Sequence, residues 1–216
     1  MRRLLTVMVC ACLLAGCDKA STPEKAAGAE AGSVPSDPLR VGTDGVYFVA
    51  LGDFPEDMLR DLAVYYRQKY NLQVQVLPKL PEPEATRHIW VWTKQVQAEP
   101  LVVSLRAAFP ELAHNPRAVL IGLTTADIYP GSVDWRFTFT WRANELHTAV
   151  VSSARMGLHY PGEPVDGSDP ETRVRKMVTK DIGLLYFGKS PSSNPRSVLY
   201  NQIGGIEELD HVGEDF

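Results

Sequence analysis

Cysteine is scarce in this sequence of 216 residues, and all three cysteines lie within the first 17 positions. A disulfide, a thiol nucleophile and a thiolate metal ligand are therefore excluded from everything after Cys17. Long apolar runs are missing too: the run from Leu4 to Leu14 is short of the roughly twenty residues that cross a bilayer. Basic residues are not in excess either, with 22 against 26 acidic ones. We expect no nucleic-acid partner, because such binding needs a basic face.

The first 17 residues have the three zones of an export signal. Arg2 and Arg3 give a positive start, an apolar run follows, and the run ends in Leu14-Ala15-Gly16-Cys17. This ending resembles the lipobox of bacterial lipoproteins. It predicts a lipoprotein signal peptide over residues 1–16 and attachment to the membrane through lipid on Cys17, in the cell envelope and facing the periplasm. The alternatives are an ordinary signal peptide that happens to contain cysteines and a buried N-terminal helix.

The rest of the chain divides into two parts. Residues 17–38 are expected to be the lipidated cysteine and a flexible tether. From Asp18 to Pro38 the sequence has no aromatic residue and buries too little apolar surface to offset the entropy of ordering. Residues 39–216 have the length of one domain with a core of its own.

Strand and helix patterns interleave along this single domain. Apolar or alternating runs predict strands at 46–51, 73–77, 118–123, 135–140 and 148–153. Apolar residues at helical spacing predict three helices: one capped by Asp53 and stopped by Asn71, one over 100–110, and one from Asp169 to about Tyr186. The interleaving indicates an α/β (or α+β) fold, with a mixed sheet packed by helices.

Three stretches of this domain follow one another in an informative order. They are Ala118–Pro130, which ends in Thr-Thr-Ala-Asp-Ile-Tyr-Pro; Ala149–Met156, which contains Val-Val-Ser-Ser-Ala-Arg; and Arg173–Gly188, which is followed by Asn194–Asn201. Their order and spacing resemble those of the archaemetzincins, a family of zinc-dependent peptidases. The resemblance covers most of the domain. It implies a metzincin-like fold in which the third stretch holds the active site.

The zinc motif that the resemblance implies is degenerate here. The family helix carries H-E-x-x-H-x-x-G, whose two histidines and a third one farther on bind zinc while the glutamate acts as general base. Matching the residues around the motif places Lys180 and Leu184 at the two histidines, Asp181 at the glutamate and Ser190 at the third ligand.

A second register comes from spacing. It aligns Gly188 with the family glycine, and a one-residue insertion would reconcile it with the first. It places the remaining positions as follows: Asp181, Leu185 and Pro191 at the ligands, Ile182 at the base, Ser192 and Ser197 at two family cysteines, and Leu199 at the Met-turn methionine.

Neither register supplies a histidine. Leu184 has no lone pair, a protonated Lys180 would repel a dication, and Asp181 alone cannot make a tight site. We therefore expect no catalytic residue, no metal ligand and no cofactor at this helix, although zinc is the cofactor of the related family. The Lys180-Asp181 pair is interpreted as a pair on the helix surface, with an ion pair or a remnant of catalysis as alternatives.

Other side chains that could carry chemistry have simpler interpretations. No two of the five histidines lie within one helical turn, although His147 and His159 flank one predicted strand and could converge on a metal. Asp127 is expected to fix its turn, with a substrate role as the alternative. Ser152 and Ser153 lack the G-x-S-x-G elbow of a serine hydrolase. Four tryptophans are expected at alternating strand positions for packing, with an exposed aromatic groove as the alternative: Trp90, Trp92, Trp135 and Trp141.

Two functions are consistent with this sequence. The first is a pseudo-peptidase lipoprotein whose former substrate cleft binds a peptide or partner protein by strand addition. The edge strand would be Trp135–Thr140 or Thr148–Ser153. The second is an active zinc-dependent metallopeptidase with a rebuilt, non-standard site that uses Asp127, Asp181 or a histidine. A purely structural role in the envelope is a third possibility, for which no sequence feature speaks.

Overall fold

The computed structural model describes residues 44–81, 95–157 and 169–216. Five strands form its main sheet, in the order β2-β1-β4-β7-β6. They are β1 (Gly45–Leu51), β2 (Val74–Val76), β4 (Ala118–Thr124), β6 (Thr140–Ala143) and β7 (Thr148–Ser152). The first four strands in this order are parallel, and β6 alone runs antiparallel, against β7. A two-stranded sheet pairs β3 (Val96–Gln97) with β5 (Ile128–Tyr129).

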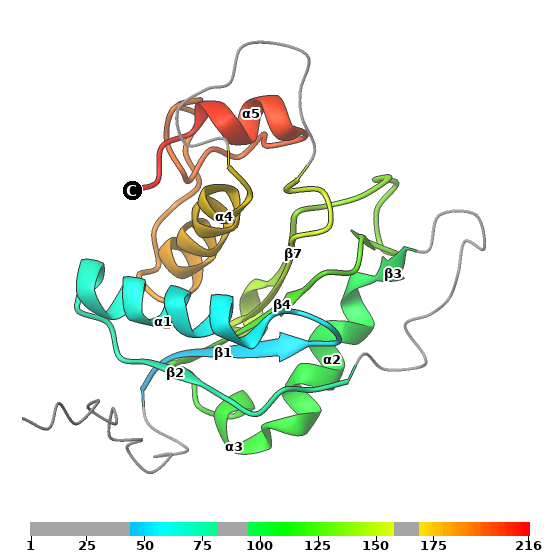
Figure 1. The fold of residues 1–216 in the computed structure, drawn as a ribbon, viewed down its shortest axis with the longest axis vertical. Coiled ribbons are helices and arrows are strands. Elements are labelled where there is room, and N and C mark those ends of the chain that lie inside the picture. The colour runs from blue at the N-terminus through cyan, green and yellow to red at the C-terminus, as the bar shows by residue number, and fades with distance from the viewer. Residues whose placement is uncertain (1–43, 82–94, 158–168) are drawn as a thin grey trace, which may run out of the picture. The chain divides into compact units, whose positions relative to one another are not determined.

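Helices cover both faces of the main sheet (Figure 1). On one face α1 (Glu56–Tyr70), α4 (Pro170–Leu185) and α5 (Ile206–His211) enclose a core that includes Phe48 and Ile121. On the other face α2 (Ala98–Ala108) and α3 (Pro110–Ala113) enclose a core that includes Tyr47 and Leu120. Because successive strand residues face opposite sides, the continuous apolar runs of β1 and β4 serve both cores. The predicted fold of a mixed sheet packed by helices is confirmed.

The helix ends follow local chemistry. Asn71 ends α1 in a left-handed conformation with φ of 51°, as predicted. The side chain of Asp169 accepts a hydrogen bond from the amide of Thr172 and so caps α4, also as predicted. The prediction that Asp53 caps α1 is wrong, because Pro55 occupies the cap position. The second helix begins at Ala98 and ends at Ala108, since Pro110 starts the separate helix α3.

The predicted strand at 135–140 is wrong in position, because the ladder begins only at Thr140. Residues 131–132 belong to a loop whose amides donate to the carboxylate of Glu99. Thr138 forms a single bridge to Ile128, and Phe137 and Phe139 pack edge to face with ring centroids 5.4 Å apart. The alternating pattern thus reflects packing in an extended loop and not a strand of the main sheet.

Strand β7 is not an edge strand, contrary to the second option for peptide pairing. It lies between β4 and β6 and is buried along its whole length. Within the described ranges the edges of the main sheet are β2 and β6.

Several predictions concern residues outside the described ranges. These are Trp90, Trp92, His88 and His159, and the predicted signal peptide and tether. Among the helices that the structure describes, none is both long and apolar enough to span a membrane.

Candidate functional site: helix α4

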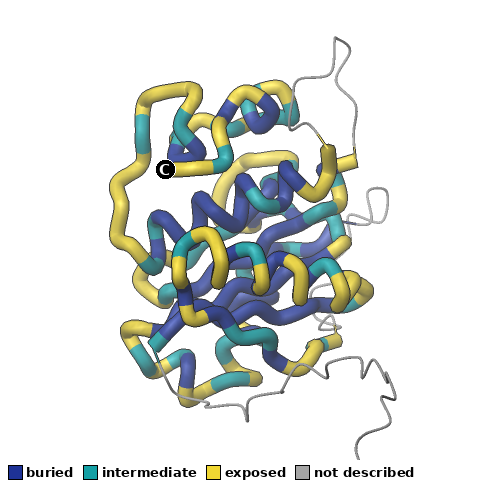
Figure 2. Tube along the Cα trace, turned by 60° about the vertical axis from the view of Figure 1, so that its left-hand side comes forward, coloured by how far each residue is buried: buried dark blue, intermediate teal, exposed yellow. Residues whose placement is uncertain are grey.

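Helix α4 carries the residues matched to the zinc motif, and it is buried along most of its length (Figure 2). The carboxylate of Asp181 is fully buried. It accepts hydrogen bonds from Thr140 Oγ1 at 2.6 Å and from Arg142 Nη1 at 2.7 Å. Thr140 and Arg142 lie two residues apart on β6, so their side chains leave the strand on the same face. These three side chains join the middle of α4 to the edge of the sheet.

Lys180 makes a second link from α4. Its side chain is buried, and its ammonium group donates a hydrogen bond to the carbonyl oxygen of Tyr200. Burial lowers the pKa of Lys180 to about 8, and the positive charge of Arg142 acts in the same direction while Asp181 opposes it. Burial also raises the pKa of Asp181, against the effects of Arg142 and Thr140. The charges of Arg142 and Lys180 both act on the Asp181 carboxylate, but Arg142 is the cation that bonds to it.

The interpretation of Lys180 and Asp181 as a surface pair is wrong, because the exposed fractions of these residues are 5% and 0%. Their partners come from β6 and from the segment after α4, not from the helix itself. Arg142 and Thr140 were missed as members of this site. The Thr-x-Arg spacing places both side chains on one face of a strand, but it does not say which helix that face meets.

The segment from Lys189 to Asn201 runs beside the end of α4. Gly188, which the second register matches to the family glycine, has φ of +60°, a conformation that favours glycine. Leu199 is buried against Gly183, where an added Cβ would lie 2.9 Å from Leu199 Cδ2. This turn and this contact favour the second register for the residues after the helix.

The two serines at the family cysteine positions are used in turns. The hydroxyl of Ser192 accepts a hydrogen bond from the amide of Asn194, and the hydroxyl of Ser197 accepts one from the amide of Leu199. Each side chain thus satisfies a backbone amide two residues ahead, as serines in turns commonly do. Their oxygens are engaged with the backbone.

The residues present at α4 do not fit a zinc ion. Lys180 places a donor group, not a lone pair, at one motif position, and the two oxygens of Asp181 are already held by Thr140 and Arg142. Across the part of the chain that the structure describes, no three His, Cys, Asp or Glu side chains form a group that could hold a metal. His147 lies in a turn, and His159, the histidine with which it could converge on a metal, lies outside the described residues. The expectation that no cofactor binds stays a prediction.

Asp127 and the two serines of the Val-Val-Ser stretch have structural partners. Asp127 makes two hydrogen bonds with Arg155, at 2.9 and 2.7 Å, which ties the loop after β4 to the loop after β7. Ser152 and Ser153 donate to the carbonyl oxygens of Ala126 and Thr124. These contacts agree with the simpler interpretations.

The two tryptophans within the described ranges differ in exposure. Trp141 packs against the core on the α2 side of the sheet, as expected for a packing residue. Trp135 is 59% exposed, in the loop that leads to β6. The expectation that Trp135 sits on a strand is wrong.

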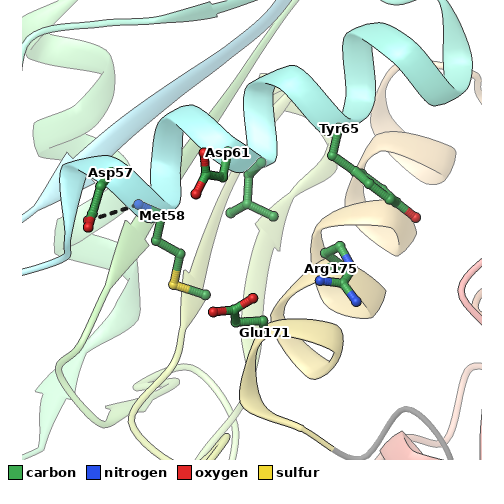
Figure 3. A pocket seen from close by; sticks show the side chains of 7 residues that line it. Asp57, Met58, Asp61, Tyr65, Glu171 and Arg175 are labelled. Atoms are coloured by element: carbon green, nitrogen blue, oxygen red, sulfur yellow. Dashed lines mark hydrogen bonds between the residues drawn. The ribbon is translucent and has the colours of Figure 1, made fainter.

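A hollow of about 300 Å³ lies elsewhere, between α1 and α4 (Figure 3). Asp57, Met58, Asp61 and Tyr65 reach it from α1, and Glu171 and Arg175 reach it from the start of α4. Arg175 is already engaged there, because it donates to Glu214 Oε2 at 3.2 Å and lies over the Tyr65 ring. The hollow is separate from Lys180 and Asp181 and has none of the residues matched to the zinc motif.

The sheet is mixed, with one antiparallel edge strand, and the buried helix α4 is tied to that edge by the contacts of Asp181. The fold is archaemetzincin-like: the archaemetzincin of Methanopyrus kandleri is similar with a TM-score of 0.59 and 20% identity, over 83% of this chain and 92% of that one. The archaemetzincin of Archaeoglobus fulgidus, solved with malonate, has a TM-score of 0.59 and 19% identity, over 79% and 94%.

A zinc-dependent peptidase from Methanocorpusculum labreanum is also similar, with a TM-score of 0.58 and 17% identity, over 80% of this chain and 95% of that one. No family model matches the sequence, and no curated protein matches it. The predicted metzincin-like fold is confirmed. At these identities the similarity concerns the fold alone.

The lowered pKa of Lys180 predicts a pH dependence of stability. Between pH 8 and its ordinary value of 10.5, the unfolded chain holds the Lys180 proton and the folded chain has lost it. The free energy of unfolding should therefore rise with pH across this window, relative to a Lys180→Met variant. The measurement is urea unfolding of both proteins from pH 7 to 10.5. Raised pKa values of Tyr66 and Tyr70 act on both proteins alike and cancel. A difference that stays constant with pH would contradict the lowered pKa of Lys180.

Proposed function

We propose that this chain is a membrane-anchored envelope lipoprotein whose archaemetzincin-like domain is a pseudo-peptidase. In this proposal the domain cleaves nothing and binds an extended peptide, or an extended segment of a partner protein, along the open edge of β6. The proposal rests mainly on the contacts of α4. Asp181 is bound by Arg142 and Thr140, and Lys180 donates to Tyr200, so the motif positions hold the domain together and leave no ligand set for a metal.

The edge strand offers the backbone groups that strand addition needs. The amide of Ser152 donates to the carbonyl of Phe139, and hydrogen-bonded pairs alternate along an antiparallel ladder. Trp141 and Ala143 therefore direct their backbone groups at β7, and the amide and carbonyl of Arg142 point away from the sheet. Within the described residues no strand pairs with that outer side. A peptide with a few extended residues could pair there.

Backbone methylation of a bound peptide tests this function. The probe is a peptide selected from a random decapeptide display library on residues 18–216, which include the compact unit 37–216. Methylating one set of alternate amides should weaken binding at least tenfold, because those amides face β6, while methylating the other set should not. The peptide is altered and not the protein, because a proline at Arg142 would also remove the contact with Asp181. Binding that tolerates both methylated sets equally, or failure to select any peptide, would remove support for the edge.

The anchor is a separate part of the proposal and rests on Leu14-Ala15-Gly16-Cys17. Cells fed a labelled fatty acid should incorporate the label into the wild-type protein, and Cys17→Ala should abolish the incorporation and release the domain from the membrane fraction. Cys12→Ala is the matched control, since Cys12 lies within the segment that cleavage removes. Equal labelling of the Cys17→Ala variant would contradict lipidation at that residue.

A further inference from the structure

In zinc sites of the H-E-x-x-H type, the metal has a structural role as well as a catalytic one. Two ligands come from one helix and the third from the segment that follows it, so the metal fastens that segment to the helix. In this chain the same two parts are α4 and the segment 189–201. They are joined instead by the hydrogen bond from the Lys180 ammonium group to the carbonyl of Tyr200. The Lys180 ammonium group thus links the same helix to the same following segment, although it does so at Tyr200 and not at Ser190 or Pro191.

The segment 189–201 has few other polar links to the helix. The amide of Lys189 donates to the carbonyl of Gly183, at the end of α4. Ser192 exchanges backbone hydrogen bonds with Leu199 and Asn201, but both of these lie within the segment. Leu199 contributes apolar contact at Gly183. Lys180 therefore supplies the charged link in the middle of α4.

Asp181 supplies the matching link on the other side. It draws Thr140 and Arg142 of β6 to α4, with Arg142 still 23% exposed and Asp181 fully buried. The Asp181 carboxylate is paired without an outside ion, since the Arg142 guanidinium group lies 2.7 Å from it. Two adjacent residues of α4 thus hold two different parts in place. Asp181 holds the edge strand, and Lys180 holds the following segment.

We infer that Lys180 is a built-in replacement for the zinc ion: with Asp181 it positions segment 189–201 and the edge strand β6 on α4, so that the peptide-binding edge keeps its shape without metal. We call the contacts of Lys180 and Asp181 the clamp. The inference rests on the proposed function, because that function gives the reason why the edge strand must keep its shape. Lys180 and Asp181 are positioning residues in this account. Neither needs to touch the peptide.

Amide hydrogen exchange tests the clamp without any peptide. In the Lys180→Met variant, exchange in segment 189–201 should rise about tenfold, the effect of losing one hydrogen bond to a charged group, while exchange in β1 stays unchanged. Lys180→Arg keeps a positive donor and should restore slow exchange in the segment. Lys79→Met, at an exposed lysine, is the matched control and should behave as the wild type. Unchanged exchange of the segment in Lys180→Met would overturn the inference.

The wild-type protein gives an independent arm if Lys180→Met fails to fold. Exchange in segment 189–201 and in β6 should be the same after dialysis against EDTA and after addition of one equivalent of zinc chloride. Faster exchange with EDTA, or slower exchange with zinc, would show that a metal holds this region and would overturn the inference. The peptide experiment and the exchange experiment can fail independently. If no peptide binds but the exchange rate depends on Lys180, the proposed function is rejected and the clamp is supported.

Discussion

Replacing Arg142 by methionine should lower the free energy of unfolding by about 3–5 kcal/mol. The variant leaves the carboxylate of Asp181 fully buried without the guanidinium group that lies 2.7 Å away. The loss should shrink at acidic pH. Burial already raises the pKa of Asp181, and removing Arg142 raises it further. Stability therefore falls as the pH rises through that raised pKa. Urea unfolding followed by circular dichroism, from pH 5 to 8, measures both effects.

The control for this prediction removes both charges. In the double variant Arg142→Met with Asp181→Leu, no buried charge is left unpaired, and most of the lost stability should return, because apolar pairs often replace buried ion pairs without net cost. Asp181→Asn alone should cost less than Arg142→Met, since Arg142, which is 23% exposed, can turn to solvent. A double variant as unstable as Arg142→Met would show that packing, and not charge, governs this contact.

Arg173→Met should also cost about 3–5 kcal/mol. Arg173 donates to both oxygens of Asp210 at 2.7 Å and to the carbonyl of Met156 at 2.6 Å. The side chains of Arg173 and Asp210 are only 4% and 8% exposed, so the variant leaves a buried carboxylate without its cation. The pair joins α4 to α5, and Lys176 adds hydrogen bonds to the carbonyls of Leu209 and Asp210. Thermal or urea unfolding measures the change.

Arg155→Met is the matched control for Arg173→Met. Arg155 makes the same two-bond contact with Asp127, but the two side chains are 33% and 22% exposed. Water can solvate Asp127 once its partner is removed, so the cost should be only about 1–2 kcal/mol, including contact between Arg155 and the Phe137 ring at 4.1 Å. Equal losses in the two variants would mean that burial does not set the strength of these pairs.

The sheet and its helices follow patterns that the sequence displays locally. The apolar runs at β1 and β4, the cap at Asp169 and the stop at Asn71 were all readable because each depends on a few neighbouring residues. The order of the strands depends on pairing across the chain, and no local pattern fixes it. Strand β7 therefore looked like a possible edge, although its neighbours β4 and β6 cover both sides. The stretch 135–139 alternates as a strand does, but it pairs only at Thr138.

The sequence predicts the helix that carries the motif positions, but it does not predict the contacts that these residues make. Adjacent Lys and Asp on a helix usually face solvent, and nothing near them in the sequence indicates burial. The partner of Asp181 lies 39 residues earlier, at Arg142, and the partner of Lys180 is a backbone carbonyl 20 residues later. Such contacts are decided by tertiary packing. The degenerate motif predicted poor zinc ligation, but only the structure gives those residues other partners.

The pair of Asp181 and Arg142 also limits which single mutations this sequence can tolerate. Changing Asp181 to histidine would leave Arg142 without its present partner, and changing Arg142 first would leave the buried Asp181 carboxylate without its cation. The second step alone costs a large part of the roughly 5–15 kcal/mol that holds a typical domain folded. A change from Asp181 to a metal ligand on α4 is therefore coupled to a change at Arg142 on β6.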